Sequence, residues 1–336
     1  MSMKVVVIQE AIIQPDLTAG ELSAHWKKLE SIPGVNLEIR YPEGYPSPEE
    51  LHDFIGDAEI VFGIWINENI INEQFLNRHP NLKYIATLGH GWQTFDVEMT
   101  RKRGITITNT IYGTQTIAEY AWALLMEVCH HTASHSDEIK HTNWSDESLQ
   151  AKFGYVHTPQ IELYGKTCGI IGLGSIGFAF AKMAQGFGMN VISYSRHKKE
   201  GSQYDFVNQV DFDTLLAESD VISIHAPFTS GTADMINKNS IAKMKDGVII
   251  INTARGGLIA EEDLLAALNS GKIYGAGLDV LREEPPTGDN PLFHSDKTVI
   301  TGHIAWLTKE SRIRACEIAV HNFKAYCEGH PVSVIN

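Results

Sequence analysis

Three ionisable residues in the C-terminal third of the chain could together reduce a carbonyl group. Arg255 follows a nearly unbroken apolar run and precedes two glycines, Glu284 stands in an acidic segment before two prolines, and His303 lies in an apolar segment. A guanidinium can hold a carboxylate through two parallel hydrogen bonds. An imidazole can donate a proton near neutral pH, and a neighbouring carboxylate favours its charged form. Reduction of a 2-oxo acid needs these three groups and a hydride donor.

Each of these residues has a plainer interpretation when it is taken alone. Arginines are usually on the surface, an acidic segment before prolines is usually a solvated turn, and a histidine among apolar residues is usually part of the core. The combination is what favours catalysis, because one residue of each kind follows a strand-like segment. Open α/β sheets bind their ligands at the carboxyl ends of their strands.

A glycine-rich segment is a candidate site for the hydride donor. Residues 166–171 resemble a short strand, Gly172-Leu-Gly-Ser-Ile-Gly177 follows, and a helical pattern runs from Phe178 to Phe187. In that setting the first glycine permits a tight turn, the second lets a pyrophosphate approach the backbone, and the third lets the helix pack closely on the sheet. The start of the helix offers free N–H groups to phosphates. The residues predicted to bind a dinucleotide here are Gly172, Gly174, Ser175, Ile176 and Gly177.

The segment after the next strand indicates which dinucleotide is bound. An NAD-specific site carries Asp or Glu near the end of the strand predicted over 190–194, but this chain has Ser195 followed by Arg196 and further basic residues. Serine removes a carboxylate that would repel a 2′-phosphate, and arginine can pair with that phosphate. We therefore predict NAD(P) as the cofactor, with NADP(H) favoured over NAD(H). A solvated basic loop is the alternative.

Composition limits the classes of partner. A chain of 336 residues is long enough for two domains, and its net charge of −14 argues against nucleic-acid and anionic-membrane partners. No HxxxH or HExxH pattern occurs, so we predict no metal site. The chain opens on a strand-like segment without a leader pattern, and no apolar run is long enough for a membrane span. The cysteines lack CxxC spacing, which predicts buried free thiols in a reducing cytoplasm: Cys129, Cys168, Cys316 and Cys327.

Strand-like and helical segments alternate, which predicts parallel β/α units. The first series has strands over 5–8, 35–39, 58–63, 82–87 and 106–108, with helices over 20–31, 48–55 and 68–76. An apolar stripe predicts one long helix over 116–140. The second series has strands over 168–171, 190–194, 221–225, 248–252 and 275–280, and the final helix is predicted over 308–327.

Five short segments carry a resemblance to a known family: Gly172–Gly177, His225-Ala-Pro-Phe-Thr229, Asn252-Thr-Ala-Arg-Gly-Gly-Leu258, Gly277-Leu-Asp-Val280 with Glu284-Pro285, and Gly302-His-Ile-Ala305. In these segments the chain resembles the D-isomer-specific 2-hydroxyacid dehydrogenases. The segments occur in the family's order and spacing, and similarity extends over almost the whole chain. Within the family, residues 161–167, 283–292 and 303–306 are most similar to glycerate dehydrogenases, also called hydroxypyruvate reductases.

This resemblance implies an α/β fold of two Rossmann-like or flavodoxin-like parallel-sheet domains with the active site in a cleft between them. Residues 1–111 and 303–336 would form the substrate, or catalytic, domain, and residues 112–302 the NAD(P)-binding Rossmann domain. It further implies a homodimer formed through the cofactor domains. The implied reaction is reduction of a small 2-oxo acid, such as hydroxypyruvate or glyoxylate, to the D-2-hydroxy acid.

The family pattern also assigns roles to individual residues. Arg255 would anchor the substrate, His303 would be the general acid/base, and Glu284 would be the partner of His303. Asp279 would hold the nicotinamide amide, and the backbone N–H groups of His90 and Gly91 would bind the substrate carboxylate. The other positions that match the cofactor-lining residues of the family are Thr116, His225, Pro227, Thr232 and Thr253.

Some positions depart from the family pattern. Gln93 replaces the usual Asn or Asp, Gly63-Ile64-Trp65 replaces Thr-Asn-Lys, and Gly302 replaces proline, while Trp65 and Trp92 would add bulk near the substrate pocket. These changes leave the choice of 2-oxo acid open. Two other functions share this fold: a cofactor-sensing, corepressor-like binding protein and a formate dehydrogenase-like enzyme. Glu284 argues against the second, because formate dehydrogenases typically carry an amide there.

Overall fold

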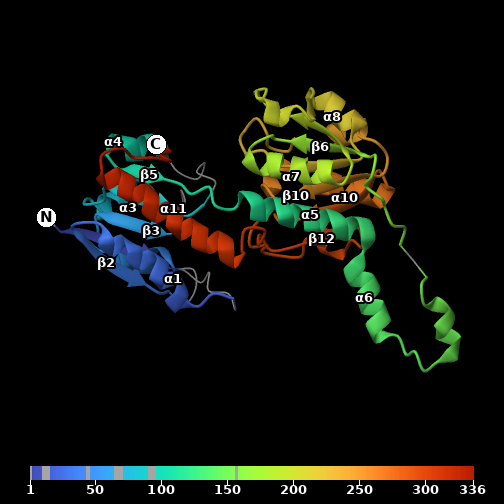
Figure 1. The fold of residues 1–336 in the computed structure, drawn as a ribbon, viewed down its shortest axis with the longest axis horizontal. Coiled ribbons are helices and arrows are strands. Elements are labelled where there is room, and N and C mark those ends of the chain that lie inside the picture. Colours follow the sequence, from blue (N-terminus) through green and yellow to red (C-terminus); the bar gives the residue numbers. More distant parts are fainter. Residues whose placement is uncertain (1, 10–15, 43–45, 64–70, 90–95, 156–157) are drawn as a thin grey trace. The chain divides into compact units, whose positions relative to one another are not determined.

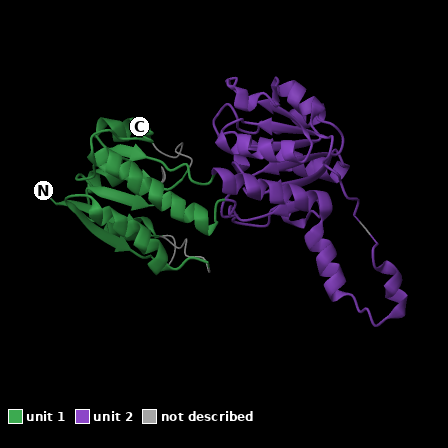
Figure 2. Ribbon diagram, in the orientation of Figure 1, with its two compact units in different colours: residues 1–113, 306–336 green, residues 114–305 purple. Residues whose placement is uncertain are grey.

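The computed structural model describes residues 2–9, 16–42, 46–63, 71–89, 96–155 and 158–336. The chain divides into two compact units, coloured separately in Figure 2. Unit 1 comprises Met1–Gly113 together with Trp306–Asn336, and unit 2 comprises Thr114–Ala305. His303 therefore groups with unit 2, whereas the boundary expected from the sequence placed it with the C-terminal helix.

Unit 1 is built on a parallel sheet whose strand order is β2-β1-β3-β4-β5, an order typical of flavodoxin-like folds. Because successive side chains of a strand point to opposite faces, β1 contributes Val5 and Val7 to one core and Val6 and Ile8 to the other. Helices α1 and α11 cover the first face, and α2 and α3 cover the second. The elements are β1 (Met3–Ile8), α1 (Ala19–Trp26), β2 (Val35–Arg40), α2 (Pro48–Ile55), β3 (Ile60–Gly63), α3 (Glu73–Arg78), β4 (Tyr84–Thr87), α4 (Val97–Lys102), β5 (Thr106–Thr108) and α11 (Lys309–Cys327).

Unit 2 contains a parallel sheet of order β12-β11-β10-β9-β6-β7-β8 (Figure 1). The order reverses between β6 and β9, and such a switch point forms the ligand crevice of a Rossmann fold. Helices α5 and α7 pack on one face of the sheet, and α8, α9 and α10 pack on the other. The elements are α5 (Thr114–His130), α6 (Thr132–His141), β6 (Thr167–Ile171), α7 (Ser175–Gly186), β7 (Asn190–Tyr194), β8 (Val207–Gln209), α8 (Phe212–Glu218), β9 (Val221–Ile224), α9 (Lys238–Lys243), β10 (Val248–Asn252), α10 (Glu261–Ser270), β11 (Ile273–Leu278) and β12 (Thr298–Ile300).

The single helix predicted over 116–140 is wrong, because the structure has two helices there. His131 adopts a left-handed conformation with φ of 50°, which ends α5 and redirects the chain into α6. The apolar stripe that motivated the prediction lies within α5, whereas α6 has no buried residue. In Figure 1, α6 leads away from the sheet of unit 2.

Other differences are smaller. The segment predicted as a helix over 20–31 divides into α1 and a 3₁₀ helix, and the short strands β8 and β12 were not predicted. All four cysteines are free as expected, but Cys327 is exposed rather than buried. Among the described residues, no helix combines the length and apolarity needed to cross a membrane. The 3₁₀ helices are Lys27–Ser31, Glu147–Lys152, Ser202–Tyr204, Gly256–Leu258 and Pro291–His294.

Candidate active site

The glycine-rich turn connects β6 to α7 at the switch point of the unit 2 sheet. Gly172 has φ of +95°, and a Cβ atom there would lie 2.7 Å from the carbonyl oxygen of His225. A Cβ atom at Gly177 would lie 2.1 Å from the carbonyl oxygen of Gly172. Both positions therefore require glycine for the fold itself. By contrast, a Cβ atom at Gly174 would meet no atom within 4 Å. The turn thus leaves open space beside Gly174, as an approaching pyrophosphate requires.

Ser195 is attached to this turn. Its hydroxyl oxygen accepts a hydrogen bond from the backbone N–H of Leu173 at 2.7 Å, so the end of β7 is fixed to the glycine loop. Arg196 follows on the exposed surface and has no ion-pair partner among the described residues. On the other side of the turn, Ser175 accepts a hydrogen bond from the hydroxyl of Thr114 at 3.2 Å.

The other predicted cofactor-lining residues lie in the same unit. Thr116 is in the first turn of α5, and the hydroxyl of Thr232 donates a hydrogen bond to the carbonyl oxygen of Pro227 at 2.8 Å. The hydroxyl of Thr253 is buried and has no hydrogen-bond partner among the described residues. An unsatisfied buried hydroxyl calls for a further partner. Together with the open space at Gly174, it fits a nicotinamide dinucleotide.

His225 is partly buried at the end of β9. Its Nε2 lies 2.9 Å from the hydroxyl oxygen of Ser223, and its ring lies 5.3 Å from the ring of Phe180. Burial lowers the pKa of His225 to about 3, so the ring is neutral at physiological pH. His225 is thus a neutral wall of the site rather than a proton donor.

His303 and Glu284 are in direct contact, as the sequence predicted. The imidazole Nδ1 of His303 lies 2.7 Å from Oε2 of Glu284, and both side chains are about one-third exposed, at 30% and 33% respectively. The other carboxylate oxygen of Glu284 accepts the N–H of Leu281 at 2.7 Å. Burial acts to raise the pKa of Glu284, but the hydrogen bonds from His303 and Leu281 and the positive charges of His303 and Arg255 outweigh it and lower the pKa. Glu284 is thus held as a carboxylate beside the imidazole.

The loop that carries His303 is fastened to Asp279. The Asp279 carboxylate accepts hydrogen bonds from the hydroxyl of Thr301 at 2.6 Å and from the N–H groups of Ile304 and Ala305, each at 2.9 Å. The N–H of His303 donates to the Asp279 carbonyl oxygen at 2.7 Å. These bonds hold His303 in a left-handed conformation with φ of 57°. Burial raises the pKa of the Asp279 carboxyl despite these hydrogen bonds.

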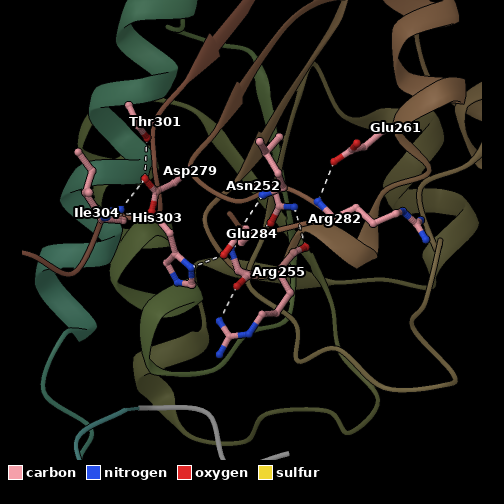
Figure 3. A network of polar contacts seen from close by, with 12 residues as sticks. Asn252, Arg255, Glu261, Asp279, Arg282, Glu284, Thr301, His303 and Ile304 are labelled. Carbon is pink, nitrogen blue, oxygen red and sulfur yellow. Dashed lines mark hydrogen bonds and ion pairs between the residues drawn. The ribbon is translucent and has the colours of Figure 1, made fainter. Parts of the chain in front are cut away.

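Arg255 lies on the turn between β10 and the 3₁₀ helix Gly256–Leu258. The residue is exposed, and its Nη1 donates a hydrogen bond to the carbonyl oxygen of Ala254 at 2.6 Å. Its positive charge lowers the pKa of Glu284, so the two groups are close enough to interact. Figure 3 shows His303 pointing toward Glu284, with Arg255 beside them. The structure thus brings the three predicted catalytic residues together within unit 2.

Some predicted residues lie outside the part of the chain that the structure describes. These are His90 and Gly91, expected to bind the substrate carboxylate, and the departures Trp65, Trp92 and Gln93. Sequence reasoning also missed two residues that hold the loops of the site, Asn252 and Thr301. The sequence identified Asn252 only as part of a motif and did not single out Thr301. Asn252 could have been found from its position, because it is a polar residue at the end of the otherwise apolar strand β10.

Comparison with known proteins places the chain in a family. Residues 122–305 match the NAD-binding domain of the D-isomer specific 2-hydroxyacid dehydrogenases. The chain is 40% identical over 335 residues to a hydroxypyruvate reductase from Blautia hydrogenotrophica, and the alignment covers 99% of this chain and 100% of the relative. It is 44% identical over 280 residues to a hydroxypyruvate reductase from Thermotoga maritima, and this alignment covers 82% of this chain and 87% of the relative.

Solved structures agree with this result. The crystal structure of a glyoxylate reductase from Paecilomyes thermophila matches with a TM-score of 0.81 and 28% identity, covering 100% of this chain and 99% of that one. The resemblance that the motifs indicated is thereby confirmed. The chain belongs to the D-isomer specific 2-hydroxyacid dehydrogenase family and is an oxidoreductase.

Proposed function

We propose that this protein reduces a small 2-oxo acid to the D-2-hydroxy acid with NAD(P)H. The observation that carries the proposal is the contact of His303 with Glu284 at 2.7 Å, with Arg255 beside them. An anion-binding cation and a proton donor with a carboxylate partner are the groups that the reaction requires. They lie in the same unit as a glycine turn that fits a dinucleotide.

In the proposed mechanism, the Arg255 guanidinium binds the substrate carboxylate and orients the neighbouring carbonyl group. His303, protonated and held through Nδ1 by Glu284, donates the proton on Nε2 to the carbonyl oxygen. When bound, the cofactor supplies the hydride. Oxidation of the alcohol uses the same residues in reverse, with His303 accepting the proton.

We assign the two units to the two expected domains. Unit 2 is the NAD(P)-binding domain and holds the cofactor phosphates at Gly172, Gly174, Ser175, Ile176 and Gly177, while unit 1 is the substrate domain. Support comes from the strand order of the unit 2 sheet and from the match of residues 122–305 to the family's NAD-binding domain. The nicotinamide-binding role assigned to Asp279 remains a prediction, and its carboxylate already accepts three hydrogen bonds from residues 301–305.

Hydroxypyruvate and glyoxylate are the substrates we propose to test first, because relatives with those names match most of the chain. The test is a panel of 2-oxo acids offered with NADPH and with NADH, followed by the absorbance of the reduced nicotinamide. Turnover of one or more members supports the proposal. No turnover across the panel alongside tight cofactor binding would favour a cofactor-sensing, corepressor-like protein instead. Turnover of formate would indicate a formate dehydrogenase-like enzyme.

NADP(H) is the cofactor form that the basic segment favours. Ser195 places no negative charge near the site of a 2′-phosphate, and Arg196 is exposed and without an ion-pair partner among the described residues. We expect Arg196→Ala to lower kcat/KM with NADPH by about tenfold, the effect of one charge-assisted contact, and to leave kcat/KM with NADH unchanged. Lys198→Ala is the matched control within the same basic segment. An Arg196→Ala enzyme with undiminished use of NADPH would contradict the preference.

We also propose that the protein is a cytoplasmic homodimer joined through unit 2. The segment from α6 to the 3₁₀ helix Glu147–Lys152 buries none of its helical residues, and the aromatic residues Phe153 and Tyr155 are 73% and 69% exposed. Large exposed aromatic side chains are typical of protein–protein interfaces. Sedimentation of the wild type should give the mass of a dimer, and a double Phe153→Ser, Tyr155→Ser variant should sediment as a lighter species. A monomeric wild type would contradict this part of the proposal.

A further inference from the structure

The side chain of Asn252 is buried where β10 ends and the turn that carries Arg255 begins. Its Nδ2 donates a hydrogen bond to the carbonyl oxygen of Arg255 at 2.9 Å, and its Oδ1 accepts one from the N–H of Ala254 at 3.0 Å. Asn252 has no exposed surface. One buried amide therefore closes the turn through both of its polar atoms, as Figure 3 shows for the contact with Arg255.

The backbone of Asn252 contributes to the other half of the site. Its carbonyl oxygen accepts the N–H of Asp279 at 3.0 Å, and the carbonyl oxygen of Asp279 accepts the N–H of His303 at 2.7 Å. Neither bond involves the amide group of Asn252. A substitution at Asn252 therefore removes its contacts with the Arg255 turn and leaves the backbone path to His303 available.

On its other side, the Arg255 turn is fixed by a close contact at Gly256. A Cβ atom at Gly256 would lie 1.9 Å from the carbonyl carbon of Leu281, so the two backbones touch. The N–H of Leu281 in turn donates to Glu284 at 2.7 Å. Steric contact thus positions one end of the turn, and the Asn252 amide positions the other.

We propose that Asn252 is a positioning residue that aims Arg255 at the substrate carboxylate, an inference that rests on the function proposed above. Arg255 is exposed and extended, with φ of −150° and ψ of 139°, and its Nη1 donates to the carbonyl oxygen of Ala254, so the backbone of the turn helps to set its direction. The Arg255 carbonyl oxygen also accepts the N–H of Leu258, but at the longer distance of 3.3 Å. A displacement of about 1 Å in a group that binds the substrate can cost on the order of 100-fold in rate.

Two substitutions test this proposal in the full-length enzyme. Asn252→Asp replaces the donor to the Arg255 carbonyl oxygen by a second acceptor, and Asn252→Ser retains a short polar group that cannot span both contacts. We expect both to lower kcat/KM for glyoxylate by about 10- to 100-fold, mostly through KM. The Kd of oxamate, a non-reducible analogue, should rise by a similar factor in the NADPH complex. The Kd of NADPH should stay as in the wild type, because the predicted phosphate-binding turn, Gly172–Gly177, is separate from the turn that carries Arg255.

Asn322→Asp is the matched control. Asn322 is also buried, and its Nδ2 donates to the carbonyl oxygen of Asn109 at 3.0 Å in unit 1. The same chemical change there should alter thermal stability without raising KM. Unchanged glyoxylate and oxamate constants in both Asn252 variants, or an equal rise in Asn322→Asp, would overturn the positioning role alone. A wild type that neither reduces 2-oxo acids nor binds oxamate would overturn the proposed function as well.

Discussion

Arg255 and His303 follow strands of the same sheet, but they are held in different ways. The His303 imidazole contacts the carboxylate of Glu284 directly at 2.7 Å, so an ionisable side chain determines its orientation. The buried amide of Asn252 fastens the backbone of Arg255 to the end of β10, and the Arg255 guanidinium donates to the carbonyl oxygen of Ala254 in the same turn. The proton donor thus depends on a partner that can lose its charge, whereas the anion site depends on a contact that does not titrate. Substitutions should separate these two kinds of support.

The largest effect is expected from His303→Ala. The substitution removes the proton donor and leaves the glycine turn untouched, so turnover should fall by about 1,000-fold. The Kd of the cofactor should be unchanged, which a fluorescence titration with NADPH would measure. Turnover at the wild-type rate would show that another group supplies the proton.

A smaller loss is expected from Arg255→Lys. Lysine keeps the positive charge but cannot form two parallel hydrogen bonds with a carboxylate, so kcat/KM should fall by about 100-fold, mostly through KM. Steady-state kinetics on glyoxylate measures the change. Arg101→Lys, on the exposed surface of α4, is the control and should behave as the wild type. An unaltered KM in Arg255→Lys would mean that the guanidinium geometry has no role in binding.

Glu284→Gln should cost about tenfold in kcat/KM and change the pH dependence. Because the pKa of Glu284 is lowered in the folded state, its carboxylate contributes to stability above its ordinary pKa of 4.5, and that contribution is lost as the pH falls below this value. The wild type keeps this charge at neutral pH, whereas the amide carries none at any pH. The loss of activity that follows protonation of Glu284 in acid should therefore be absent from the variant. Superimposable pH profiles would remove Glu284 from the proposed mechanism.

The smallest effect on turnover is expected from His225→Gln, which should change stability instead. The folded state holds His225 neutral down to about pH 3, whereas the unfolded chain takes up a proton near pH 6.5. Stability is therefore fully present above pH 6.5 and falls as the pH decreases, by at most about 1.4 kcal/mol per pH unit. Urea unfolding between pH 4 and 7 should show a shallower decline for the variant. Parallel declines would show that His225 is protonated in the folded protein.

The same comparison explains which parts of the site the sequence could predict. Arg255, Glu284 and His303 carry reactive groups after recognisable strand-like segments, so their types and order indicated their chemistry. Asn252 acts through hydrogen bonds to a turn, and its role depends on backbone geometry that no local pattern specifies. The contact of Gly256 with Leu281 joins segments 25 residues apart and becomes visible only in three dimensions.

Some elements of the fold could likewise be predicted from the sequence, and others could not. The strands β7 and β10 and the helix α2 have the bounds that the sequence predicted, because apolar runs and capping residues mark their ends. The break between α5 and α6 falls at His131, without a proline or a glycine to signal it. The apolar stripe does stop before His131, and the polar composition of α6 was the evidence that the prediction overlooked. The three-residue strands β8 and β12 have one buried residue and none, whereas β5, which is equally short and was predicted, has two.

Unit 1 is completed by residues from both ends of the sequence. Helix α11 packs on its sheet, Val334 bridges to Thr108, and the amide of Asn336 donates to the carbonyl oxygen of Ile105 at 2.6 Å. Residues 114–305 lie between these two segments and form unit 2 on their own. During synthesis, unit 2 therefore leaves the ribosome whole while β1 to β5 still lack α11. Since domains fold as units once their residues are available, the first unit to be started is the last to be finished.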